Sequence, residues 1–93
     1  ISNLVSLQTL LLNENRLTGT IPMGFSNFTF LDELDLSFNQ LTGTISESIG
    51  NLVWLRSFDL SFNQLIGTIP QRITNMTSLQ IFGLSSNQGI GIG

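Results

Sequence analysis

The sequence predicts one α/β solenoid domain of stacked coils, with a parallel β-sheet along one face and short helical turns in each coil. Two observations predict this fold: the chain repeats with a period of 24 residues, and each repeat holds two stretches where apolar and other residues alternate. A unit this short cannot bury its own apolar face, so successive units must stack. The repeats define one segment over residues 1–93, with units over about 4–27, 28–51 and 52–75 and a partial unit over 76–93.

Each unit contributes one strand to the predicted parallel sheet. Residues alternate with period two around Leu10-x-Leu12, which directs both leucines inward. Their equivalents one and two units later should also lie in the core and contact each other across coils about 4.8 Å apart. These equivalents are Leu34, Leu36, Phe58 and Leu60.

A second short strand and a helical turn complete each unit. Alternation recurs in Leu17-x-Gly19-x-Ile21, and Pro22 and Pro70 stand where a helical turn begins and a missing N–H costs nothing. Ser46 replaces this proline in the second unit, so we expect its turn to be less fixed. Residues 88–93 are so rich in glycine that we expect them to hold a strand poorly.

Composition narrows the possible functions. Hydrophobic residues make up 41% and charged residues 10%, which is too apolar and too weakly charged for a disordered tail. Three basic residues and a net charge of −3 argue against nucleic acid or an anionic membrane as a partner. There is no Cys and no His, so we expect no metal site, no cofactor and no enzymatic activity. Without an initial Met or a signal-peptide pattern, the chain is expected to be a fragment of a larger protein.

The repeat unit reads LxxLxxLxLxxNxLxGxIPxx(F/I)xN, which resembles the leucine-rich repeat. The LxGxIP extension, present at residues 17–22 and 65–70, resembles the plant-type subclass. This resemblance implies a right-handed solenoid with the parallel β-sheet on the concave face and short helical turns on the convex side. It also implies a ligand- or protein-binding module similar to the ectodomains of plant receptor-like kinases and receptor-like proteins. Such a segment would lie on the extracellular side of the plasma membrane, as part of a larger protein, and bind a protein, a peptide or a small extracellular ligand. A cell-wall inhibitor of the polygalacturonase-inhibitor kind uses the same repeat and is an alternative.

Asparagines recur at one equivalent position of successive repeats. This asparagine column is predicted to have a structural role. A solenoid turn leaves backbone groups unpaired, and an Asn amide can both donate and accept inside that turn. This column contains Asn15, Asn39, Asn63 and Asn87. A second column lies half a repeat away, and two of its members, Asn27 and Asn75, stand in Asn-x-Thr sequons that are candidate glycosylation sites.

The exposed positions of the concave sheet give the candidate partner-binding site. Leucine-rich repeats usually bind partners on this face, and here Asp35 lies beside Asp59, with Glu33 near and with Phe38 and Phe62 on the flank. Like charges on neighbouring strands repel unless they are solvated or met by a cation from a partner. Alternatively, Asp35 and Asp59 have no binding role, because Leu-Asp-Leu-Ser is a common form of this repeat. A catalytic carboxylate pair is disfavoured, because an open sheet offers no pocket to raise one pKa.

Two further columns lie outside that site. Asp32 and Arg56 should pair across adjacent coils, and Phe30 and Trp54 should stack on a flank as packing against the next segment, with a binding hot spot as the alternative.

Outward threonines on the second strand suggest a different class of function. If equivalent residues align, they form a small flat array that resembles the surfaces of ice-binding β-solenoids, although threonine is also a common strand former. The candidate ice-binding residues are Thr18, Thr20, Thr42, Thr44 and Thr68.

Overall fold

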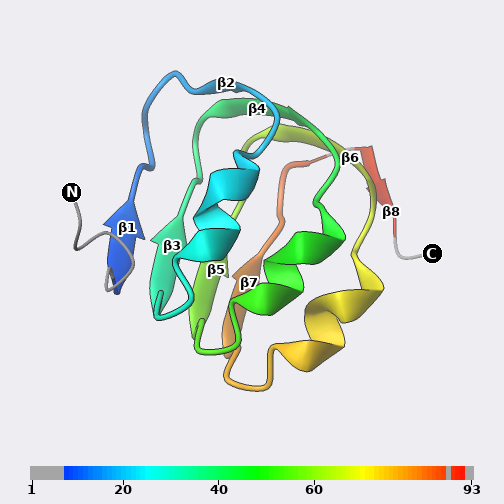
Figure 1. Cartoon of the computed structure of the whole chain (residues 1–93). Helices are drawn as coiled ribbons and strands as arrows, with labels where there is room; N and C mark the ends of the chain where they lie inside the picture. Colours follow the sequence, from blue (N-terminus) through cyan, green and yellow to red (C-terminus); the bar gives the residue numbers. More distant parts are fainter. Residues whose placement is uncertain (1–7, 88, 92–93) are drawn as a thin grey trace.

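The computed structural model describes residues 8–87 and 89–91, which form a solenoid of stacked coils (Figure 1). Two parallel four-stranded sheets run along it, in the orders β1-β3-β5-β7 and β2-β4-β6-β8. The first sheet contains β1 (Thr9–Leu11), β3 (Glu33–Asp35), β5 (Ser57–Asp59) and β7 (Ile81–Gly83). The second contains β2 (Thr18–Gly19), β4 (Gln40–Gly43), β6 (Gln64–Thr68) and β8 (Gly89–Gly91). The predicted solenoid of stacked coils with a parallel sheet is confirmed.

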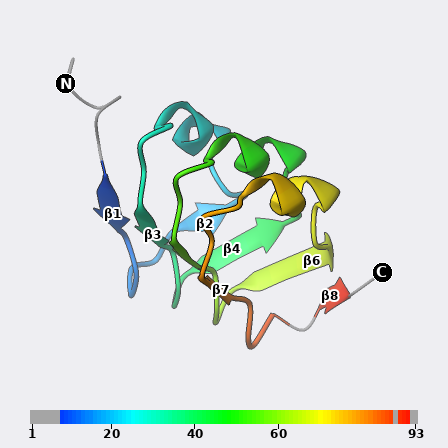
Figure 2. The ribbon, with the colours of Figure 1, turned by 90° about the horizontal axis from the view of Figure 1, so that it is seen from below.

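Short 3-10 helices form the third side of the first three coils, as Figure 2 shows. They are η2 (Met23–Asn27), η3 (Glu47–Asn51) and η4 (Gln71–Asn75). Pro22 and Pro70 precede η2 and η4, as the sequence predicts. The expectation that the Ser46 turn is less fixed overlooked its side chain, which accepts a hydrogen bond from the backbone N–H of Ser48 and caps η3. No helix in the described part of the chain is long and apolar enough to cross a membrane.

The first sheet keeps the register of the sequence repeat. Leu10 pairs with Leu34, and Leu34 pairs with Phe58, so equivalent apolar side chains stack along the solenoid. Leu34, Leu36, Phe58 and Leu60 are fully buried. Leu10 and Leu12 are only half-buried, because the described chain covers their coil on one side alone.

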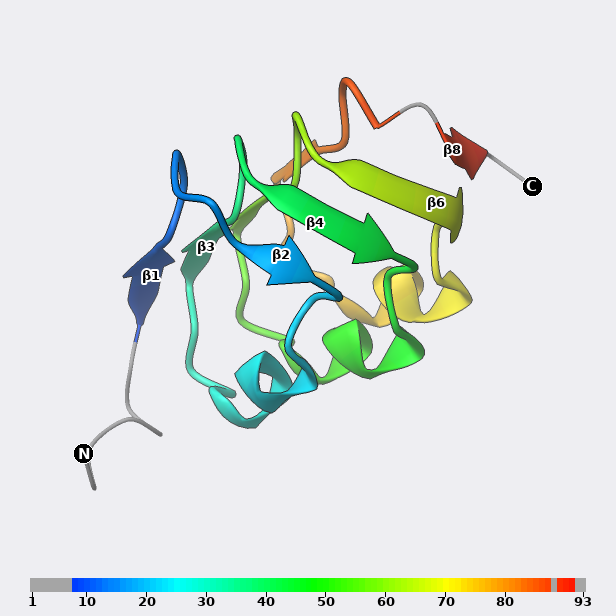
Figure 3. The ribbon, with the colours of Figure 1, turned by 90° about the horizontal axis from the view of Figure 1, so that it is seen from above.

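The second sheet, whose strands lie side by side in Figure 3, has a different register, which the sequence did not predict. Thr18 pairs with Gln40 and Thr42 pairs with Gln64, so β2 and β4, and likewise β4 and β6, are displaced by two residues from the repeat. β6 and β8 are displaced by one residue, because Ile66 pairs with Gly89. The central glycines Gly43 and Gly67 have φ of 81° and 90°, a left-handed conformation that glycine adopts without steric cost.

The glycine-rich end does form a strand. Expecting 88–93 to hold a strand poorly was wrong for the described residues 89–91, where β8 pairs with β6 through Ile66↔Gly89 and Gly67↔Ile90. Ile90 packs against the core, and the missing side chain of Gly89 leaves room for Ile66. A Cβ at position 89 would lie 2.5 Å from Cγ2 of Ile66.

Candidate functional site

Asp35 on β3 and Asp59 on β5 are neighbours in register and half-buried on the concave sheet. One oxygen of each carboxylate is used within its own coil. Oδ1 of Asp35 accepts from Ser37 N at 3.0 Å and from Ser37 Oγ at 2.6 Å, and Oδ1 of Asp59 accepts from Ser61 N and Oγ. Among the described residues, neither Oδ2 has a hydrogen-bond partner. The two carboxylates therefore order the chain after their strands, and each keeps its Oδ2 without a hydrogen-bond partner in the described structure.

The acidic pair ends sharply at β7. The position equivalent to Asp59 is Gly83, and a Cβ there would lie 2.5 Å from Oδ1 of Asp59. The Asp59 carboxylate thus occupies space that a side chain on β7 would need. Leu11 on β1 stands on the other side of Asp35 and is exposed. Glu33, in register with Ser57 on β5, extends the negative surface along the first sheet.

Phe38 and Phe62 form an exposed stack in the turns that follow β3 and β5, three residues after Asp35 and Asp59. Their ring centroids lie 4.3 Å apart with an interplanar angle of 10°, and the residues are 50% and 46% exposed. Both have left-handed backbones, with φ of 57° and 60°, which is uncommon for a bulky residue. Glu14 and Ser86 share this conformation one coil to either side, so it belongs to the turn itself. The turn displays two flat aromatic rings to solvent beside the acidic pair.

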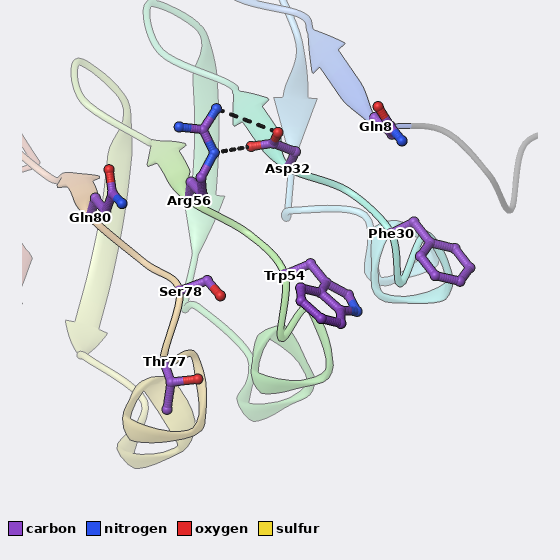
Figure 4. A pocket seen from close by; sticks show the side chains of 8 residues that line it. All are labelled: Gln8, Phe30, Asp32, Trp54, Arg56, Thr77, Ser78 and Gln80. Atoms are coloured by element: carbon purple, nitrogen blue, oxygen red, sulfur yellow. Dashed lines mark hydrogen bonds and ion pairs between the residues drawn. The ribbon is translucent and has the colours of Figure 1, made fainter.

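A hollow of about 570 Å³ lies at the start of the concave strands (Figure 4). Asp32 and Arg56 form the predicted ion pair there, with Nε 2.7 Å from Oδ1 and Nη2 3.4 Å from Oδ2. This hydrogen bond, together with the charge of Asp32, raises the pKa of Arg56 above its usual value. The remaining residues that line the hollow are Gln8, Phe30, Trp54, Thr77, Ser78 and Gln80.

Phe30 and Trp54 do not pack as the sequence suggested. They are 56% and 59% exposed, and their rings make no aromatic contact among those found in the described chain. Ser78 is the equivalent residue on the next coil, and it is too small to cover the indole. The sequence repeat correctly places Phe30, Trp54 and Ser78 at equivalent positions of successive coils. Whether a ring at this position is covered depends on the size of the side chain on the next coil.

The asparagine column links each coil to the one before it. Asn39, Asn63 and Asn87 are buried, and each amide donates to carbonyl oxygens of two coils. Nδ2 of Asn39 reaches Leu12 O and Leu36 O, both at 3.0 Å, and its Oδ1 accepts from Leu17 N at 3.1 Å. Asn15 is exposed and bonds only within its own coil.

The sequon residues are accessible. Asn27 and Asn75 end helices η2 and η4, and both side chains are exposed, as are Thr29 and Thr77 two residues later.

The threonine columns are exposed but not aligned as expected. The two-residue displacement places Thr18 beside Gln40 and Thr42 beside Gln64, so the predicted alignment of Thr18 with Thr42 is wrong. The Cγ2 methyl groups of Thr20 and Thr44 lie over Gly43 and Gly67 of the next coil, 2.9 Å from where a Cβ would be. These methyl groups fill space above glycines, and Thr18 and Thr42 do not face each other across the sheet. Thr68 is exposed on β6 and pairs with Gly91.

Within the described residues, no cluster of three or more His, Cys, Asp or Glu could hold a metal ion.

Comparisons with known proteins agree with this architecture. Residues 29–73 match a family model of two leucine-rich repeats, and residues 6–28 match a model of one. No curated protein sequence matched the chain. Solved structures did match, and they include the three plant receptors described next.

The ectodomain of the receptor kinase SOBIR1 from Arabidopsis thaliana is 35% identical, with a TM-score of 0.83 over 92% of this chain and 46% of that one. The Arabidopsis receptor kinase HAESA ectodomain, in complex with an extended IDA peptide hormone, is 37% identical, with a TM-score of 0.87 over 92% of this chain and 15% of that one. The plant peptide hormone receptor RGFR1, in complex with RGF2, is 43% identical, with a TM-score of 0.84 over 87% of this chain and 13% of that one. The chain spans less than half the length of each.

The chain belongs to the leucine-rich-repeat family, and its repeats are of the plant receptor-ectodomain type.

Proposed function

We propose that this chain is a ligand-binding segment of a plant extracellular receptor, and that its concave face binds a peptide or protein segment carrying arginine or lysine. The observation that carries the proposal is the pair of unpartnered Oδ2 atoms on Asp35 and Asp59, beside the exposed Phe38–Phe62 stack. A guanidinium group can bond a carboxylate and stack on an aromatic ring at once. These residues supply both groups side by side.

Charge on the concave strands supports a basic ligand. Glu33, Asp35 and Asp59 lie on β3 and β5, while the basic residue at the start of β5, Arg56, is already paired with Asp32. A negative surface attracts a positive partner and disfavours a negative one. The structurally similar receptors HAESA and RGFR1 were solved with peptide hormones, which supports a peptide as the ligand class.

Calorimetry with an amidated tetra-arginine peptide tests the proposal. Asp35→Asn with Asp59→Asn should weaken binding by about tenfold or more, because each lost charge-assisted hydrogen bond is worth about 1.5–3 kcal/mol. Folding should persist, since an Asn oxygen can still accept from Ser37 or Ser61. Glu47→Gln, on the helical side, is the control for losing a negative charge away from the site, although it removes one charge and the double variant removes two. Binding that is unchanged in the double variant, or weakened equally by Glu47→Gln, would contradict the proposal.

A further inference from the structure

The hollow beside Trp54 is a second surface, separate from the acidic pair. Part of its polar lining forms a row with one side chain from each coil, apart from the hydroxyl residues Thr77 and Ser78, and Figure 4 shows the row beside the two aromatic rings. The row consists of Gln8, Asp32, Arg56 and Gln80. Its volume of about 570 Å³ falls within the range of small-molecule sites.

This row is polar but carries no net charge. Asp32 and Arg56 neutralise each other through two contacts, and Gln8 and Gln80 are uncharged amides. Carboxylate, guanidinium and amide groups offer donors and acceptors side by side, and hydroxyl groups can both donate and accept. The chemistry favours a neutral ligand with many hydroxyl groups over a charged one.

The aromatic side of the hollow favours a ligand that also has an apolar face. Trp54 and Phe30 expose more than half of their surface, and nothing in the described chain covers them. A sugar ring presents C–H groups on its faces and hydroxyls on its edge, so it can contact an indole and hydrogen-bond to the polar row at once.

Spacing distinguishes a glycan from a peptide. Successive members of the row are one strand apart, about 4.8 Å, whereas an extended peptide advances about 3.4 Å per residue and falls out of step with the coils. An extended β-1,4-linked glycan advances by nearly one strand spacing per sugar. We propose that this hollow binds a neutral β-1,4-linked oligosaccharide lying across the coils, with a sugar face on Trp54 and hydroxyls on Asp32 and Arg56.

The chain carries its own reporter for this site. Trp54 is its single Trp and there is no Tyr, so emission excited at the indole band comes from the hollow alone. Titration with cellotetraose, a β-1,4-linked glucose tetramer, should change Trp54 emission saturably. Maltotetraose, which has the same sugars in a bent α-1,4 linkage, should bind at least about tenfold more weakly, as should tetragalacturonate because of its charge. No saturable change with cellotetraose up to millimolar concentration would overturn the proposal, as would tighter binding of either comparison sugar.

Variants locate the ligand and separate this site from the peptide site. Arg56→Lys keeps the positive charge but loses the planar guanidinium group with its several N–H donors, and should weaken cellotetraose binding about tenfold. Trp54→Ala, followed by calorimetry, should abolish binding while circular dichroism shows an intact fold. Phe38→Ala should leave cellotetraose binding unchanged. Sugar binding that survives Trp54→Ala, or hollow variants that weaken only the tetra-arginine peptide, would refute the glycan site and leave the acidic pair to its own test.

Discussion

Nδ2 of Asn63 donates to the carbonyl oxygen of Leu36 at 2.9 Å, across 27 residues of sequence. The same nitrogen bonds Leu60 O at 3.0 Å, and Oδ1 accepts from Leu41 N at 3.0 Å. One buried side chain therefore satisfies backbone groups in two coils, and no apolar residue of similar size can replace it.

Replacing Asn63 should therefore destabilise the solenoid. Asn63→Leu leaves buried backbone groups unpaired, and we expect the free energy of unfolding to fall by about 1–3 kcal/mol. Asn15→Leu is the matched control, because Asn15 is exposed and bonds only within its own coil. Urea denaturation measures both, and equal midpoints for the two variants would contradict this role.

The glycines of the second sheet separate backbone strain from steric contact. Gly19 and Gly43 have φ of 80° and 81°, but only a Cβ at position 43 would meet Thr20. Gly19→Ala should destabilise by about 1–2 kcal/mol through conformation alone, and Gly43→Ala by more. Combining Gly43→Ala with Thr20→Ser, which removes the methyl group, should recover the excess. Equal thermal stabilities of the two single variants would show that the methyl contact yields without cost.

Position 62 tests whether the left-handed turn is strained. Phe62→Ala and Phe62→Gly both remove the stack on Phe38, so their difference reports the backbone alone. Glycine adopts φ of 60° without steric cost, and we expect Phe62→Gly to be more stable than Phe62→Ala by about 1 kcal/mol. Denaturant titration measures the difference, and an Ala variant at least as stable as the Gly variant would rule out strain.

Secretion from a eukaryotic host tests the sequons. Asn27 and Asn75 are exposed, so we expect the protein to carry glycan at both sites and to lose mass on endoglycosidase treatment. Asn27→Gln and Asn75→Gln should each remove one glycan by mass spectrometry. Asn51→Gln is the control, since Asn51 ends η3 in the same way but lacks a hydroxyl residue two positions later. A secreted chain without glycan at either site would disprove the expectation.

The fold could be read from sequence because its determinants repeat. The 24-residue repeat places Leu34 and Phe58 at one position of successive coils, and Asn39 and Asn63 at another. Each position therefore predicts which residues are buried and which coil they contact. The register of the second sheet could not be predicted from the sequence. The repeat suggests that equivalent residues pair with each other, whereas β2, β4 and β6 are displaced by two residues next to left-handed glycines such as Gly43.

The candidate site was predictable in part. The register of the first sheet follows the repeat, so Asp35 and Asp59 were expected to be neighbours. Their bonds to the serines two residues later were missed, although Asp-x-Ser is a spacing at which a carboxylate commonly bonds the backbone. Exposure of Trp54 was missed because it depends on the small size of Ser78.

The asparagine bonds give the solenoid a direction. The N–H groups of Leu17, Leu41 and Leu65 donate to Asn39, Asn63 and Asn87, each supplied by the following coil. During synthesis the N-terminal part of the chain emerges first. The backbone N–H of each of these leucines therefore has no asparagine partner until the next repeat has been synthesised. Ordering should then travel down the nascent chain one coil behind the ribosome, and an arrest between repeats would leave the newest coil open.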